Sequence, residues 1–419
     1  MLLKYLKVLG RRNFSLLWFG QVISQFGDRL TQIALVGLVS QASMSSSSLA
    51  FTMSMAIIPV FIISPISGVY VDRWSKRKTM YVSDLIRCAL VLMIPLVFSR
   101  YKALLPVYLL IFLSFSAGRF FIPAKMAFIP QVIGSGDIFM ANSLISITAT
   151  VAAVIGIGLG GIIVERYGVS SVFYFDAGTF LISSLSIFLI ASREKSRFEA
   201  RDILNIGKDV VATVKRSFFN ELREGFQYIF KSKETKYAFK IYLFLFSYIG
   251  GLYVVFIRFI QQALSSVTRD LGFTAVSLGA GIFLGSLIYG RIAHRFSIKG
   301  IINLAIFLSS AYLIFFAVSL RSFPSSVRAV IFAFILGIIV SPAFIGVNAL
   351  IHRESDKNLL GRIFSGLEFT SHLGFLIAMF AASWLADIFN PFVIVVSLAV
   401  MGMIGSLIFI INHDTAQRT

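Results

Sequence analysis

Long apolar runs alternate with short polar connections along almost the whole chain. A helix of about 20 apolar residues is long enough to cross the hydrocarbon core of a bilayer. Six runs occupy the first half of the chain and six the second, at 14–40, 48–71, 79–99, 103–130, 140–164, 169–191, 238–264, 273–293, 299–320, 326–350, 361–386 and 391–412. This pattern predicts an all-α membrane protein with twelve transmembrane helices.

One long polar stretch separates the two sets of runs. It mixes charges of both signs, and its apolar side chains recur at helical spacing, at Phe219, Leu222, Phe226 and Ile229. A helix of this kind lies on a membrane surface. We therefore expect a six-helix half at 1–191, a cytoplasmic linker with an amphipathic helix at 192–237, and a second six-helix half at 238–419.

The two halves repeat each other in sequence. The segment 68–77 follows the second run and 290–299 follows the eighth, and they share a glycine, an arginine and a serine in the same register. Pro123 and Pro342 also fall at corresponding places in runs four and ten. Halves repeated about an axis along the membrane normal are typical of transporters, whose substrate site lies near the midplane.

Composition excludes a soluble protein. Hydrophobic residues make up 57% of the chain and charged residues only 14%, against about 25% charged in soluble domains. The net charge of +19 is not gathered on a basic arm, so nucleic acid is not expected as a partner. Most cations follow alternate runs, which by the positive-inside rule places both termini in the cytoplasm.

The sequence also lacks the usual marks of an enzyme. Cys88 is the single cysteine, so the chain has no internal disulfide and no cysteine-based metal site. No phosphate-binding Gly-x-x-x-x-Gly-Lys-(Ser/Thr) loop is present. We expect no cofactor, no metal and no ATP hydrolysis, which leaves an ion gradient or passive exchange to drive transport.

The segment from Gly68 to Lys78, here called the signature loop, resembles that of the major facilitator superfamily. The pattern Gly-x-x-x-Asp-Arg-x-x-(Arg/Lys)-(Arg/Lys) is filled without a gap by Gly68, Asp72, Arg73, Lys76 and Arg77. The resemblance implies two six-helix bundles and a cytoplasmic gate at this loop. Gly68 would allow close helix approach, and Asp72 would accept bonds from a facing helix N-terminus. Asp84 and Arg87, near the cytoplasmic end of run three, are assigned to the same gate.

Further segments resemble the macrolide-efflux and enterobactin-export branch of that superfamily. They are spread over the chain, at 20–28, 83–87, 141–144, 176–177, 221–225 and 361–365. Gly156-Ile-Gly-Leu-Gly-Gly161 resembles the antiporter motif of the superfamily, but Ile157 stands where a proline is expected. These glycines equally fit close helix packing.

Polar residues inside the apolar runs are the candidate site. A charge near the bilayer centre is costly and usually faces a partner or a cavity. Gln21, Gln25, Asp28 and Gln32 share one face of the first helix, with Asp28 near mid-depth. We expect this stripe either to line the transport cavity, where Asp28 binds a proton, a cation or the substrate, or to form an interhelical hydrogen-bond seam.

Other intramembrane charges extend this candidate site. Arg119 in run four is a possible counter-charge to Asp28 or a contact for an anionic substrate. Glu368 and His372 lie one turn apart in run eleven and either carry a proton or satisfy each other. Asp176 and Arg258 lie toward the outer ends of their helices and are assigned to an outer gate.

Together these features predict a monomeric, multi-pass transporter of the bacterial inner membrane. The expected function is export of a hydrophobic or amphipathic, drug-like small molecule by proton antiport, with alternating access of one half against the other. The alternatives are export of an anionic siderophore, a lipid flippase or solute importer of the same fold, and a non-transporting scaffold or sensor.

Overall fold

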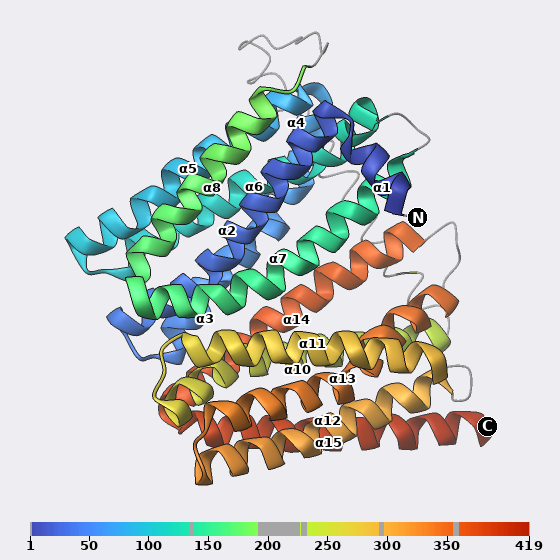
Figure 1. Cartoon of the computed structure of the whole chain (residues 1–419). Helices are drawn as coiled ribbons and strands as arrows, with labels where there is room; N and C mark the ends of the chain where they lie inside the picture. Colours follow the sequence, from blue (N-terminus) through green and yellow to red (C-terminus); the bar gives the residue numbers. More distant parts are fainter. Residues whose placement is uncertain are drawn as a thin grey trace. The chain divides into compact units, whose positions relative to one another are not determined.

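The computed structural model describes residues 2–133, 137–191, 227, 233–292, 297–354 and 360–418. The helices fall into two compact units, and Figure 1 labels them. The predicted linker helix and the second-half positions 293–296 lie outside the described residues. So do the side chains of residues 361–365, although the backbone there is helical.

The first unit contains the helices up to α8, apart from residues 45–50. Their bounds are α1 Leu2–Leu9, α2 Arg12–Ala42, α3 Ser46–Ile62, α4 Ser64–Arg73, α5 Lys76–Tyr101, α6 Leu104–Ile133, α7 Ile138–Tyr167 and α8 Val169–Phe188. Within this unit α2 packs on α7 and α8, while α5 packs on α6 and α8. The apolar core includes Phe14, Met80, Phe121 and Phe128.

The second unit contains the remaining helices and residues 45–50. Their bounds are α10 Lys233–Leu264, α11 Arg269–Ile292, α12 Ile298–Ser322, α13 Ser326–Glu354, α14 Leu360–Ile388 and α15 Pro391–Arg418. Here α10 packs on α14 and α15, α11 on α13, and α12 on α13 and α15. A buried cluster that includes Ile241, Ile302 and Val347 joins α10, α12 and α13.

The twelve predicted spans are all present in the described ranges, which confirms the all-α membrane fold. Ten are single helices that are long and apolar enough to cross a bilayer, and the bent pair α3 and α4 makes an eleventh. The twelfth is α2, which has 31 residues and is therefore about 46 Å long. Its polar stripe makes it less apolar than the other spans.

The second span is broken where a continuous helix was expected. The run 48–71 forms α3 and α4, which meet at Ile63 with a bend of 52°. Pro65 lies in the first turn of α4, where it has no N–H to donate and its ring would clash with the preceding helical turn. The proline therefore ends α3 and begins α4.

Glycines let α2 approach α7 and α8 closely. A Cβ at Gly156 would lie 2.7 Å from Arg29 Cβ, and one at Gly160 would lie 3.3 Å from Leu30 Cδ2. On the other side of α2, a Cβ at Gly27 would overlap the carboxylate of Asp176. The glycine-rich run of α7 thus serves helix packing here, as small residues do between membrane helices.

Candidate functional site

A group of charged and amide side chains lies inside the first unit, between α2, α5 and α6. We call it the polar cluster, and it consists of Gln21, Gln25, Asp28, Asp84, Arg87, Arg119 and Lys125. Three cations and two carboxylates are thus gathered among the apolar side chains of a membrane bundle. Such a concentration of charge is expensive in a bilayer, which makes the polar cluster the candidate functional site.

The central pair of the polar cluster is Asp28 on α2 and Arg87 on α5. Arg87 Nη2 donates to Asp28 Oδ1, and its guanidinium lies 4.0 Å from the ring centroid of Phe180 on α8. The Asp28 side chain is 29% exposed and that of Arg87 is 11% exposed. The pair is therefore shielded on the arginine side and accessible on the aspartate side.

This pairing differs from the one that the sequence suggested. Arg119 was expected either as a counter-charge to Asp28 or as a contact for an anionic substrate, and Arg87 was grouped with the signature loop. The helix α5 begins at Lys76, so Arg87 lies about 17 Å along it, near mid-depth. That depth brings Arg87 level with Asp28 rather than with Asp72.

Lys125 on α6 is a member of the cluster that the sequence analysis missed. Its Nζ donates to Gln21 Oε1 over 3.1 Å, and Gln25 Nε2 lies 3.5 Å from the same oxygen. It also lies close enough to Asp28 to interact with it electrostatically. A lysine inside the apolar run 103–130 was the signal available in the sequence.

The polar stripe of α2 does not face one environment. Gln32, the last residue of the stripe, accepts a hydrogen bond of 3.2 Å from Arg29 Nη1 on the same helix. Gln21 instead accepts from Lys125 on α6, Gln25 donates to Gln21 on its own helix, and Asp28 accepts from Arg87 on α5. The stripe therefore divides between an interhelical seam and a local contact.

Two other carboxylates of the first unit are fully buried and joined to neighbouring helices. Ser183 on α8 donates to Asp84 Oδ2 over 2.6 Å. Thr31 on α2 donates to Asp176 Oδ2 over 2.5 Å, and Thr179 donates to Asp176 Oδ1 over 3.0 Å. These acids tie α8 to α5 and to α2, and their gating roles stay predictions.

Arg119 contributes a cation that is not neutralised within the cluster. Its Nε is buried without a hydrogen-bond partner among the described residues. Arg87 and Asp28 both lie close enough to interact with it electrostatically. Arg87 is paired to Asp28, and the role of Arg119 as a counter-charge or a substrate contact stays a prediction.

The signature loop connects α4 to α5. Lys76 Nζ donates to the backbone oxygens of Asp72 and Trp74, over 2.8 and 3.0 Å, and Arg77 donates to the carbonyl of Phe188 over 2.6 Å. Asp72 and Arg73 have exposed side chains. No described atom lies within 4 Å of the position where Gly68 would carry a Cβ. The gating role of this loop stays a prediction.

Glu368 and His372 lie on α14 in the second unit. His372 Nδ1 lies 2.7 Å from the backbone oxygen of Glu368, one helical turn away. Arg258 is buried on α10, where it donates to Gln261 over 2.8 Å and to the carbonyl of Ser45 over 3.0 Å. The proton-carrying role of the α14 pair and the gating role of Arg258 stay predictions.

The fold and the polar cluster agree with what the chain resembles in sequence. The family model of the Major Facilitator Superfamily matches residues 17–365, which is most of the chain. The chain belongs to the major facilitator superfamily. This membership makes it a multi-pass membrane transporter of a small molecule, and not an enzyme.

The chain is similar both to an uncharacterized transporter of this superfamily and to an efflux protein. It is 26% identical to the uncharacterized MFS-type transporter YkuC of Bacillus subtilis (strain 168), over 86% of this chain and 82% of that protein. It is 22% identical to macrolide efflux protein A of Streptococcus pyogenes, over 84% of both chains. Its fold matches a crystal structure of the nucleoside transporter NupG with a TM-score of 0.72 at 13% identity, covering 95% of this chain and 98% of that one.

Proposed function

We propose that the chain exports a hydrophobic or amphipathic, drug-like small molecule from the bacterial cytoplasm by proton antiport. The efflux relative supports the direction of transport and the class of substrate. Both termini would lie in the cytoplasm, as the positive-inside rule predicts. The two halves would alternate access to a site near the bilayer midplane.

One observation carries this proposal, namely the partly exposed Asp28 held by Arg87. Asp84 and Asp176 are fully buried and hydrogen-bonded to hydroxyl groups of neighbouring helices. Asp28 is the acid of the polar cluster that water or a substrate can reach, because its side chain is 29% exposed. A reachable carboxylate near mid-depth is suited to bind a proton in one state and a substrate in the other.

The exchange follows from the charge of Asp28. As a carboxylate, Asp28 accepts from Arg87 and attracts a basic or polar group of the substrate. A proton on Asp28 removes that charge, so the attraction to Arg87 weakens and the substrate loses its partner. Proton and substrate therefore compete for Asp28, which is the requirement for antiport.

Transport by purified protein in proteoliposomes tests this function. With an acidic lumen, the outward proton gradient should drive uptake of a macrolide or an amphipathic dye. Asp28→Asn should abolish uptake driven by the gradient and weaken binding of the labelled substrate, because the neutral amide resembles the protonated acid. Asp137→Asn is the matched control, because Asp137 is also ion-paired, with Arg11, but lies outside the polar cluster. An Asp28→Asn protein with normal gradient-driven uptake would refute the assignment.

An anionic substrate is the second candidate, and the charge of the polar cluster favours it. Arg87, Arg119 and Lys125 outnumber Asp28 and Asp84, and Arg119 Nε has no partner among the described residues. A siderophore with several acidic groups would complement this excess of positive charge. Arg119→Gln should then abolish siderophore transport while it leaves uptake of a neutral macrolide unchanged. Inward uptake of solute, or movement of lysolipid between leaflets, would instead support the importer or flippase.

A further inference from the structure

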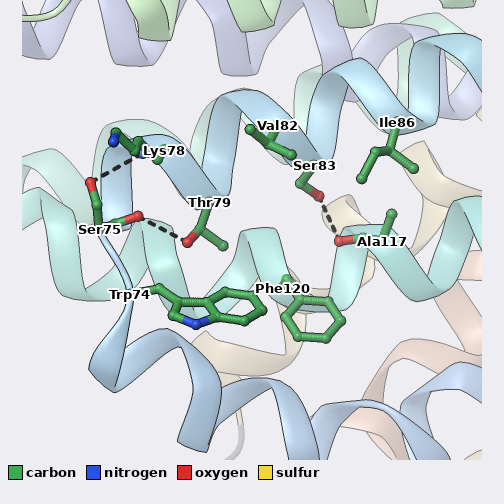
Figure 2. Close-up of a pocket in the computed structure, with 9 residues that line it drawn as sticks. All are labelled: Trp74, Ser75, Lys78, Thr79, Val82, Ser83, Ile86, Ala117 and Phe120. Carbon is green, nitrogen blue, oxygen red and sulfur yellow. Dashed lines mark hydrogen bonds between the residues drawn. The ribbon is translucent and has the colours of Figure 1, made fainter. Parts of the chain in front are cut away.

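A second cavity lies in the first unit, away from the polar cluster. It has a volume of about 470 Å³ and lies between α5 and α6, next to the signature loop. Figure 2 shows its lining side chains, which are Trp74, Ser75, Lys78, Thr79, Val82, Ser83, Ile86, Ala117 and Phe120.

The wall of the cavity is formed mostly by carbon atoms. The rings of Trp74 and Phe120 stack with their centroids 5.9 Å apart and their planes 18° apart. The two buried hydroxyl groups of the lining are bonded to backbone oxygens, Thr79 to Ser75 over 2.9 Å and Ser83 to Ala117 over 2.6 Å (Figure 2). A polar substrate would leave its own polar groups without partners here, so the occupant must be a hydrocarbon.

The cavity opens on an apolar surface of the bundle. Val82 is 42% exposed and Ile86 is 46% exposed, and Leu85 between them is exposed as well. In a protein that spans a membrane, exposed side chains of this kind face the lipid. The hydrocarbon that reaches the cavity is therefore a lipid acyl chain.

The cation at the loop end of the cavity selects the headgroup. Lys76 and Arg77 donate to backbone oxygens, as described above. Lys78 is exposed and lines the cavity, and its ammonium group has no bond to any described residue. Acyl chains gain no hydrophobic energy on moving from lipid into an apolar groove. Selectivity must therefore come from the charge on Lys78.

We propose that this cavity binds one acyl chain of an anionic phospholipid, whose phosphate lies on the Lys78 ammonium. The lipid comes from the leaflet at the signature-loop end of the protein. It fills the space beside Trp74 and Phe120 and thereby fixes the connection between α4 and α5. This site is independent of the transported substrate and of the direction of transport.

Trp74 provides a local readout of binding. In a Trp18→Phe, Trp384→Phe background it is the single tryptophan of the chain. Bromine atoms on an acyl chain in the cavity would quench its fluorescence. The full-length protein in detergent micelles is titrated with dibrominated phosphatidylglycerol, and separately with phosphatidylcholine that carries the same brominated chains.

We expect half-quenching at about fivefold lower phosphatidylglycerol than phosphatidylcholine, because one lysine near a membrane surface contributes about that factor. Lys78→Gln should erase this difference. Lys102→Gln, at the opposite end of α5, should preserve it. Val82→Phe should reduce quenching by both lipids, because the larger side chain narrows the mouth of the cavity.

Three results would overturn the proposal. Equal half-quenching concentrations of the two lipids, measured with the cavity residues unsubstituted, would show that charge does not select the lipid. Equal effects of Lys78→Gln and Lys102→Gln would remove the role of this lysine. Displacement of the brominated lipid by a transported macrolide would make the cavity a substrate site instead.

Discussion

The ion pair between Asp28 and Arg87 should stabilise the first unit, and the contribution of each charge should depend on the presence of the other. Breaking a fully buried pair costs about 3–5 kcal/mol, whereas an exposed pair contributes about 0–1 kcal/mol. With side chains 29% and 11% exposed, this pair lies between the two limits. We therefore expect Asp28→Asn to lower the free energy of unfolding by about 2 kcal/mol.

The double variant Asp28→Asn, Arg87→Gln separates the interaction energy between the two charges from their interactions with other groups. Arg87→Gln should also cost about 2 kcal/mol, part of it from the lost contact with the Phe180 ring. If the charges interact, the double variant should lose about 2 to 3 kcal/mol rather than the sum of the two single losses. The coupling energy is then about 1 to 2 kcal/mol.

Equilibrium unfolding in mixed micelles measures the free energy of unfolding of the unsubstituted protein, the two single variants and the double variant. The matched control is the pair of Arg11 and Asp137, with a distance of 2.7 Å and an arginine that is 39% exposed rather than 11%. Its coupling energy should stay below about 1 kcal/mol. Additive losses for Asp28→Asn and Arg87→Gln would show that the two charges do not stabilise each other, and the reasoning from burial would be wrong.

Two further predictions concern the close helix crossings. Gly27→Ala should lower the free energy of unfolding by about 1–3 kcal/mol, because its Cβ would overlap the carboxylate of Asp176. Gly178→Ala, on α8 with open space around it, should leave the free energy of unfolding unchanged or raise it. A loss for Gly178→Ala as large as that for Gly27→Ala would contradict this account. In the second unit, Gly250→Ala should lower the free energy of unfolding more than Gly27→Ala, because the obstructing atom is the backbone oxygen of Phe375 rather than a side chain that can rotate. Thermal unfolding in detergent ranks the three variants. An equal unfolding midpoint for Gly250→Ala and the unsubstituted protein would refute the prediction.

The spans were predictable because a long apolar run that crosses a bilayer in this kind of protein must form a helix. A segment in lipid must satisfy its own backbone hydrogen bonds, so length and hydropathy suffice to predict a helix. The exception was the run 48–71, where Pro65 divides the helix at Ile63. A proline in a membrane helix is compatible with a continuous helix as well as a break, as α6 shows around its own Pro123.

The partners of the intramembrane charges were less predictable. Helical spacing places Asp28 on a face of α2, but it does not say which helix lies opposite that face. Arg87, Arg119 and Lys125 were all available in the sequence, and Lys125 was not among the predicted site residues although it lies in the same apolar run as Arg119. The packing of α8 against both α2 and α5, and of α6 against α5, brings all three cations near Asp28.

By itself, the sequence determined the membrane class, the helices and the family of this protein, because hydropathy and the signature loop are local properties of the chain. The tertiary structure alone decided that Asp28 pairs with Arg87, that Asp84 and Asp176 bond to hydroxyl groups of neighbouring helices, and that the α7 glycines serve packing against α2. These contacts join residues far apart in sequence, and they depend on the order and depth at which whole helices pack together, which no local pattern encodes.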